Sequence, residues 1–151
     1  MFPTIIIRHK KENLKKCSLR GLEKRDNFLF YSYPNQIAQL PDLTDYILLK
    51  MGAEELKSCD NKKGLLLIDS TWRYLDKILK IIPKNITIRS LPKNFVTAYP
   101  RKQTFCLDPK SGLASIEALY LAHMITKRDT STILDNYYWK EDFLKTNKFS
   151  V

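Results

Sequence analysis

The sequence predicts an α/β fold in which helices cover a mainly parallel sheet, and three observations lead to this class. Short β-branched or apolar runs alternate with helical patterns along the chain, as they do in βαβ units. The run GLLLID at 64–69 is apolar at successive positions, which is typical of a strand covered on both faces. With 151 residues, 44% of them hydrophobic, the chain is long enough to bury one sizeable core.

The predicted strands are short and are separated by turn or helix signals. They are, in chain order, 4–8 (TIIIR), 27–34 (NFLFYSYP), 46–50 (YILLK), 64–69 (GLLLID), 86–89 (ITIR) and 94–99 (NFVTAY). Pro34 ends the second run, since proline cannot donate a hydrogen bond to a sheet ladder. The run 46–50 could also form a short helix, but its length and its flanking residues favour a strand.

Helical patterns follow the later strands. The segment STWRYLDKILKII at 70–82 is amphipathic, because one face of a helix would collect Trp72, Leu75, Ile78, Leu79 and Ile82. The segment 113–125 is apolar almost all round and predicts a buried helix, whereas 137–147 predicts an amphipathic helix or helical turn. Residues 52–63 read as a helical turn followed by a polar loop, and 100–112 as a long loop.

Charge is the strongest global feature of the composition. The chain has 26 Lys and Arg against 16 Asp and Glu, a net charge of +10, and residues 8–25 alone hold eight basic and two acidic residues. Such an excess favours an anionic partner, most simply nucleic acid, although a solvated basic face would look the same. We therefore expect a small basic N-terminal lobe at 1–60 that contacts nucleic acid and a larger unit at 61–151, or else one compact unit.

Several classes of protein are not supported by the sequence. No window approaches the roughly 20 apolar residues of a membrane span, and the start MFPTIIIRHKK does not resemble a signal peptide. Three cysteines without a C-x-x-C spacing, together with two histidines, support neither a disulfide framework nor a metal site. These features predict a reduced, cytoplasmic protein.

The segment LIDSTW at 67–72 combines a strand end with polar side chains. In parallel sheets, ligands bind outside the carboxyl ends of the strands, and Asp69 lies at such an end. Asp, Ser and Thr are also the preferred N-caps, so these residues could simply start the next helix. Trp72 could likewise belong to the core. From the residues alone, both a helix cap and the floor of an active site stay open.

The motif IDSTW is similar to the Asp-x-Ser/Thr-Trp signature of two related groups of aminocarboxypropyltransferases, one acting on small-subunit ribosomal RNA and one, the DTW-domain group, on tRNA uridines. The resemblance continues, in order, with KKCSLRGLEKRDNFLF (15–30), SLPKNFVTAYP (90–100), LASIEAL (113–119) and YYWKEDFLKTN (137–147). Tyr99 and Ala114 depart from the ribosomal pattern, and the 100–112 loop looks more like the DTW group. Since both groups have SPOUT-like folds, the resemblance implies a C-terminal trefoil knot, a rare exception to unknotted connectivity.

The resemblance implies a reaction in which a 3-amino-3-carboxypropyl group is transferred from S-adenosylmethionine to ring nitrogen 3 of a uridine or pseudouridine. Asp69 would be the catalytic residue, as a general base or as a group that positions the substrate. The implied cofactor-binding residues are Ser18, Trp72, Leu91, Ala98, Leu113, Ala114 and Ser115. Glu117 opens the buried helix, where its charge favours the N-terminal dipole, so we expect a structural role for it.

The same resemblance assigns the basic residues to RNA phosphates, which position an RNA without reading its sequence. The expected contacts are Lys10, Lys11, Lys15, Lys16, Arg20, Arg101 and Lys102. Small-subunit ribosomal RNA is the expected substrate, which would place the protein in ribosome biogenesis, with tRNA as the alternative. An RNA methyltransferase and a non-enzymatic RNA-binding or ribosome-assembly factor also stay open. No metal is expected. No exposed apolar stripe decides the oligomeric state, for which a monomer is slightly favoured.

Overall fold

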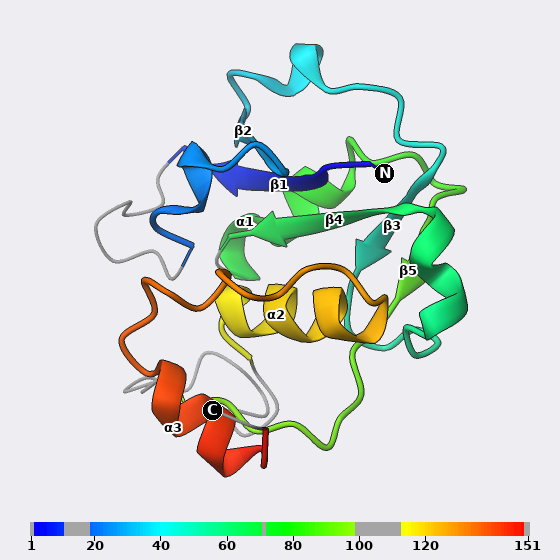
Figure 1. Cartoon of the computed structure of the whole chain (residues 1–151). Helices are drawn as coiled ribbons and strands as arrows, with labels where there is room; N and C mark the ends of the chain where they lie inside the picture. Colours follow the sequence, from blue (N-terminus) through cyan, green and yellow to red (C-terminus); the bar gives the residue numbers. More distant parts are fainter. Residues whose placement is uncertain (1, 11–18, 71, 99–112, 150–151) are drawn as a thin grey trace.

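A single five-stranded sheet forms the centre of the molecule (Figure 1). The computed structural model describes residues 2–10, 19–70, 72–98 and 113–149. The strands are β1 (Thr4–His9), β2 (Phe28–Tyr33), β3 (Tyr46–Leu49), β4 (Gly64–Asp69) and β5 (Thr87–Arg89). Every pair of neighbouring strands in the order β2-β1-β4-β3-β5 is parallel, so the predicted parallel α/β class is confirmed.

The register aligns the carboxyl ends of the three strands β2, β1 and β4. Arg8 on β1 lies opposite Ser32 on one side and Asp69 on the other. Strand β4, which follows residue 60, lies between β1 and β3, which both precede it. This arrangement brings the ends of β1 and β4 to the same edge, where parallel sheets bind their ligands.

Helices cover the two faces of the sheet. They are α1 (Trp72–Leu79), α2 (Ser115–Ile125) and α3 (Lys140–Thr146), together with the 3-10 helices η1 (Leu22–Lys24), η2 (Ile37–Gln39) and η3 (Ser58–Lys62). Side chains on a strand alternate between faces. Accordingly, Ile5 and Ile7 pack in one core cluster with Ile78 of α1, whereas Ile6 packs in another with Leu119 of α2. Figure 1 shows α1 and α2 on opposite sides of the strands.

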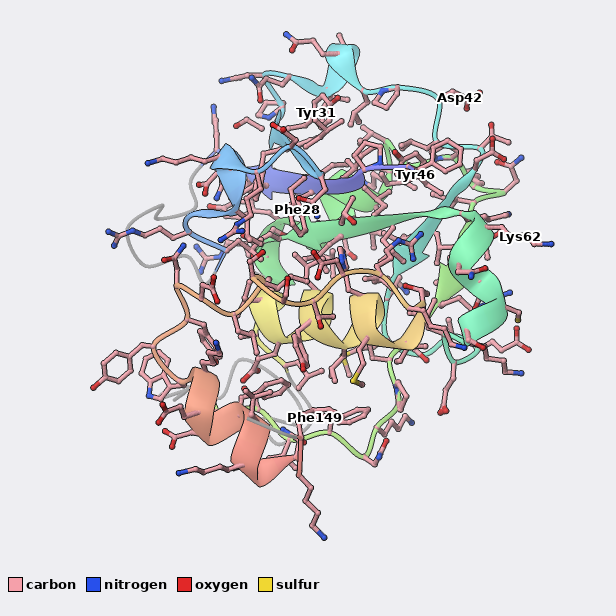
Figure 2. The ribbon with its side chains drawn as sticks, in the orientation of Figure 1. Phe28, Tyr31, Asp42, Tyr46, Lys62 and Phe149 are labelled. Carbon is pink, nitrogen blue, oxygen red and sulfur yellow. The ribbon has the colours of Figure 1, made fainter. Side chains whose placement is uncertain are left out.

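Aromatic rings join the C-terminal residues to α2. Phe149, labelled in Figure 2, stacks on Phe95 with ring centroids 5.6 Å apart and meets Tyr120 of α2 edge-on at 5.7 Å. Phe143 of α3 is fully buried and contacts both Tyr120 and Phe149. The end of the chain therefore packs against the residues that precede and follow the 99–112 segment.

A buried histidine near the C-terminal end of α2 connects this helix to β1. The Thr4 hydroxyl lies 2.9 Å from His123 Nε2, and His123 Nδ1 lies 3.3 Å from the carbonyl of Asp129. A carbonyl can only accept, so Nδ1 carries the proton and Nε2 accepts from Thr4. Burial lowers the pKa of His123 to about 4, and nearby Arg128 acts in the same direction. The imidazole is therefore neutral at pH 7.

Two expectations for the local structure are wrong. The segment 94–98 forms no strand, although its sequence alternates like one. Its backbone bonds instead to side chains: the amide of Asn147 bonds to both the N–H and the carbonyl of Val96, at 2.7 and 2.8 Å. Helix α1 also ends at Leu79, three residues before the predicted end, although Ile82 still packs into the core.

The remaining elements follow the sequence with small shifts. The helical turn and the polar loop expected at 52–63 occur in the opposite order, since residues 52–57 form no helix and the 3-10 helix lies at Ser58–Lys62. The helix expected within 137–147 spans Lys140–Thr146. No helix in the part of the chain that the structure describes is long and apolar enough to cross a membrane.

Candidate active site

The candidate catalytic residue lies at the end of the central strand and contacts a helix that begins 46 residues later. Asp69 is the last residue of β4, and it is half-buried. The hydroxyl of Ser115, the first residue of α2, donates a hydrogen bond to Asp69 Oδ1 at 2.7 Å. The fold thus brings together two of the residues that the sequence assigned to one site, and the contact orients the carboxylate.

A fully buried carboxylate organises the backbone around the start of α2. Glu117 Oε1 accepts from the Thr97 hydroxyl at 2.6 Å and from the Ala114 N–H at 2.8 Å. Its Oε2 accepts from the Ala98 N–H at 2.8 Å and from the Tyr137 hydroxyl at 2.9 Å. Each oxygen therefore takes one backbone N–H and one hydroxyl, which matches the roughly four acceptor sites of a carboxylate. Glu117 fastens three separate segments to one point.

The role of Glu117 is larger than its place in the sequence indicates. Its bond to the Ala114 N–H is half of a capping box, in which a residue at the third helical position accepts from the N-cap. The sequence could have predicted this bond, because Glu117 stands three residues after the N-cap of an apolar helix. The bonds from Thr97 and Tyr137 join residues 20 positions away in each direction, and no local pattern could have revealed them.

The apolar residues assigned to the cofactor gather near this carboxylate. Leu91, Ala98 and Leu113 are partly buried and pack against the core cluster that includes Ala114 and the buried side of α2. The N–H groups of Ala98 and Ala114 both donate to Glu117. The N–H groups of both alanines are therefore engaged, and the carbonyl of the buried Ala114 accepts from the Ala118 N–H at 2.9 Å. Ala98, which is half-buried, is the alanine that offers apolar surface to a ligand. Such a set suits an adenosine held between apolar walls.

The other residues assigned to the cofactor are only partly described. Ser18 lies outside the described residues. Trp72 begins α1 directly beyond the end of β4, but its side chain lies outside the described part. The first turn of α1 is held against β1 by a stacked pair, His9 and Tyr74, whose ring centroids are 3.8 Å apart at 14°. This stacking fixes the start of α1 at the same edge of the sheet as Asp69.

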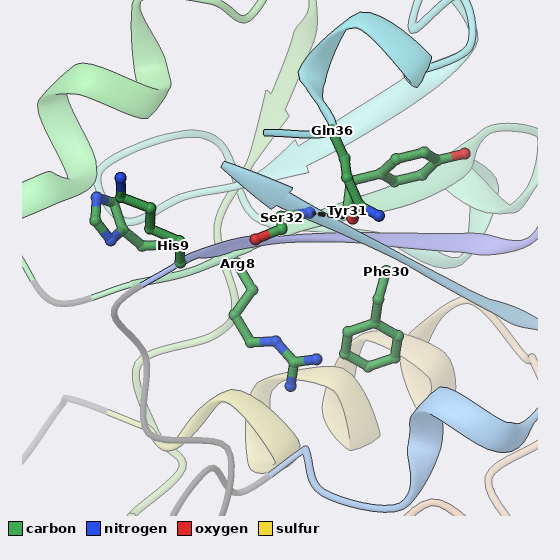
Figure 3. Close-up of a pocket in the computed structure, with 7 residues that line it drawn as sticks. Arg8, His9, Phe30, Tyr31, Ser32 and Gln36 are labelled. Carbon is green, nitrogen blue, oxygen red and sulfur yellow. Dashed lines mark hydrogen bonds between the residues drawn. The ribbon is translucent and has the colours of Figure 1, made fainter. Parts of the chain in front are cut away.

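Lys10, an expected RNA contact, lines a cavity of about 260 Å³ at the carboxyl ends of β1 and β2. The cavity is also lined by Arg8, His9, Phe30, Tyr31, Ser32 and Gln36 (Figure 3). The Arg8 guanidinium lies 4.6 Å from the centre of the Phe30 ring and pairs with Glu23 at 3.3 Å. Glu23 therefore offsets part of the positive charge on this wall.

Arg20, the other described RNA candidate, lines a different cavity of about 430 Å³ together with Gly21, Lys24 and Asn136. Among the described residues, Lys10 and Arg20 thus line two different cavities. The other expected RNA contacts, Lys11, Lys15, Lys16, Arg101 and Lys102, lie outside the described residues. Among the residues that are described, no group of three or more His, Cys, Asp or Glu side chains could hold a metal ion.

Comparisons with known proteins give one strong structural likeness. No family model matches the sequence, and no curated protein matches it significantly. The fold is similar to that of the SAM-dependent rRNA:acp-transferase Tsr3 from Vulcanisaeta distributa, with a TM-score of 0.73. The match covers 98% of this chain and 80% of that chain, at 24% sequence identity. At this identity the likeness establishes the fold.

Proposed function

We propose that the chain is an S-adenosylmethionine-dependent RNA aminocarboxypropyltransferase, acting in the cytoplasm on ring nitrogen 3 of a uridine or pseudouridine in small-subunit ribosomal RNA. The observation that carries the proposal is the 2.7 Å bond between Ser115 and Asp69, which joins the motif at the end of β4 to the start of α2. The structurally similar protein from Vulcanisaeta distributa, an rRNA:acp-transferase, supports the same reaction.

The residues present suit the cofactor. S-adenosylmethionine supplies a sulfonium that activates each of its three attached carbons, so the binding site decides which group is transferred. In the proposal, Leu91 and Leu113 contribute apolar walls that bury the methyl group, and Ala98 and Ala114 pack beside the adenosine. Trp72 and Ser18 complete this set by their place in the sequence motifs. The positions of Ala98 and Ala114 relative to each other depend on Glu117, because both of their N–H groups donate to its carboxylate.

Asp69 is proposed to take the proton from the ring nitrogen that receives the transferred group. General-base catalysis typically contributes about 10²–10⁴-fold in rate. The bond from Ser115 to Oδ1 restricts the rotation of the carboxylate and holds it in one orientation. A base held in this way loses little conformational entropy when the substrate binds.

The finer parts of the proposal concern the knot and the RNA. A trefoil knot would pass through residues 99–112, which lie outside the described residues. Lys10 and Arg20, with Lys11, Lys15, Lys16, Arg101 and Lys102, are proposed to contact phosphates. Binding through phosphates predicts an affinity that falls steeply with salt. Because β1 and β4 are neighbours, Lys10, the residue after β1, lies at the same edge of the sheet as Asp69.

The test is incubation of the protein with total RNA and S-adenosylmethionine labelled either in the methyl carbon or in the carboxyl carbon. Incorporation of the carboxyl label alone is the expected result. Incorporation of the methyl label would refute the proposal and identify a methyltransferase. RNA binding without either label and without cofactor affinity would identify a binding or assembly factor. Fractionating the labelled RNA separates ribosomal RNA from tRNA.

A further inference from the structure

One aromatic side chain lies outside the site described above and is almost fully exposed. Tyr138 has 87% of its surface exposed, more than any other large hydrophobic residue that the structure describes. Its ring meets Trp139 edge-on, with centroids 5.0 Å apart, and Trp139 in turn contacts Tyr137 at 6.0 Å. Tyr137 is buried and bonds to Glu117. Tyr138 is therefore an exposed ring on a firmly anchored segment.

A polar cavity lies beside this segment. Asn136, two residues before Tyr138, lines the cavity of about 430 Å³ with Arg20, Gly21 and Lys24. This volume falls within the range of about 300–1,000 Å³ that small-ligand sites have, whereas the 260 Å³ cavity at Lys10 falls below it. None of the lining residues is acidic, so the wall presents two cations and one amide.

The two walls of the cavity are held together closely. Gly21 adopts a φ of +99°, and a Cβ at that position would lie 2.1 Å from Asn136 Nδ2, so only glycine permits this approach. Arg25 and Asp135 form an ion pair at 3.9 Å between the same two segments. In Figure 1 the blue segment around η1 and the orange segment before α3 lie on the same side of the molecule.

This combination matches what unpaired RNA offers, which is phosphates for the cations and free base faces for the ring. Arginine and lysine bind phosphate oxygens, and an asparagine amide can both donate to and accept from a base edge. An exposed tyrosine ring stacks on an unpaired base, which has a free face, whereas bases within a duplex are already stacked. A duplex could contact the cations but would offer the ring no free base face to stack on.

We propose that the cavity and Tyr138 form a binding surface for an unpaired segment of RNA, with a phosphate at Arg20 and Lys24 and a base on Tyr138. The inference rests on the proposed action on RNA and adds what the substrate must look like beside the modified position. The site shares no residue with the pair Asp69 and Ser115, so it holds a flanking nucleotide instead of the target base.

The test measures RNA binding by fluorescence anisotropy, without S-adenosylmethionine. The probes are a short labelled oligoadenylate and a labelled RNA duplex of similar length. Tyr138→Ala should weaken binding of the oligoadenylate by roughly 5- to 100-fold and leave binding of the duplex unchanged. Tyr138→Phe keeps the ring and should bind as the wild type does. Thermal unfolding checks that both variants are folded, as expected for so exposed a position.

A charge control tests the phosphate half of the site. Lys24→Ala should make the slope of log affinity against log salt concentration less steep by about 1, because one phosphate contact is lost. Lys84→Ala, at an exposed lysine after α1 that does not line the cavity, should leave the slope unchanged. An unchanged slope for Lys24→Ala would remove that residue from the site.

The outcomes separate this inference from the proposed function. Wild-type affinity of Tyr138→Ala for the oligoadenylate, or equal weakening for both probes, would overturn the inference even if the chain transfers the carboxyl label. Conversely, Tyr138-dependent binding by a chain that transfers no label would support the inference and refute the proposed enzyme.

Discussion

Replacing Glu117 by glutamine tests whether one buried carboxylate holds the candidate site together. Each carboxylate oxygen accepts from one backbone N–H and one hydroxyl. In glutamine, one of the two oxygens becomes an NH₂ group, which cannot accept. Whichever way the amide turns, the N–H of either Ala98 or Ala114 loses its acceptor, while the hydroxyl beside it can rotate and accept instead.

The size of the effect follows from these four bonds. Leaving one buried N–H without a partner costs about 1–3 kcal/mol, and each of the other bonds loses about 1 kcal/mol when its charge assistance disappears. Removing the buried charge also relieves its desolvation, which offsets part of the loss. We expect Glu117→Gln to lower the free energy of unfolding by roughly 2–4 kcal/mol, and Glu117→Ala to lower it further.

Urea unfolding followed by circular dichroism measures this difference. For a chain of this size, such a loss moves the midpoint by roughly 1 M or more. Glu141→Gln is the matched control, because Glu141 is exposed on α3 and its change should stay within about 0.5 kcal/mol. If Glu117→Gln unfolds at the wild-type midpoint with the same slope, the four hydrogen bonds do not stabilise the fold as argued.

Three further predictions concern the catalytic residue, the buried histidine and the glycine at the cavity. Asp69→Asn should retain affinity for S-adenosylmethionine in a binding titration but slow carboxyl-label transfer by about 10²–10⁴-fold, and unchanged turnover would leave Asp69 as a helix cap. The pKa of His123 in the folded state, about 4, is below its usual 6.5, so the unfolded chain takes up the proton first. Stability present above pH 6.5 should therefore fall by about 3 kcal/mol as pH drops to 4, and urea titrations of His123→Gln should show a smaller fall. Gly21→Ala should cost more than Gly52→Ala in the same assay, because both have positive φ but only Gly21 meets a neighbour, and equal costs would contradict the close packing against Asn136.

The parts of the fold that depend on local pattern could be predicted from the sequence. The run 64–69 becomes β4 because a continuous apolar run suits a strand covered on both sides, and Ser115–Ile125 becomes α2 because it is apolar all round. The strand predicted for 94–98 was wrong. Its sequence alternates as a strand does, but the distant Asn147 side chain forms hydrogen bonds with the backbone of Val96. A pattern within a few residues carries no information about such a partner.

For the candidate site, the sequence likewise predicted individual residues but not the contacts between them. Asp69 could be found because it follows an apolar run directly, and the companion motifs placed Ser115 in the same list of residues. The direct bond between them depends on how α2 packs on the sheet, so only the fold could show it. The exposure of Tyr138 could not be predicted from the sequence either. Three aromatic residues stand in a row, and nothing in their identity shows that Tyr137 is buried, Trp139 half-buried and Tyr138 exposed.

The position of β4 in the sheet also sets the order in which the molecule can be completed during synthesis. Strand β1 can pair with β2 early, but β3 has no neighbour until β4 and β5 have been made. Pairings between strands far apart in the chain form late and slow folding. The central strand therefore enters a gap between two strands made before it, and its last residue is Asp69. A nascent chain therefore acquires its candidate catalytic carboxylate with the strand that joins β1 to β3, before β5 completes the sheet.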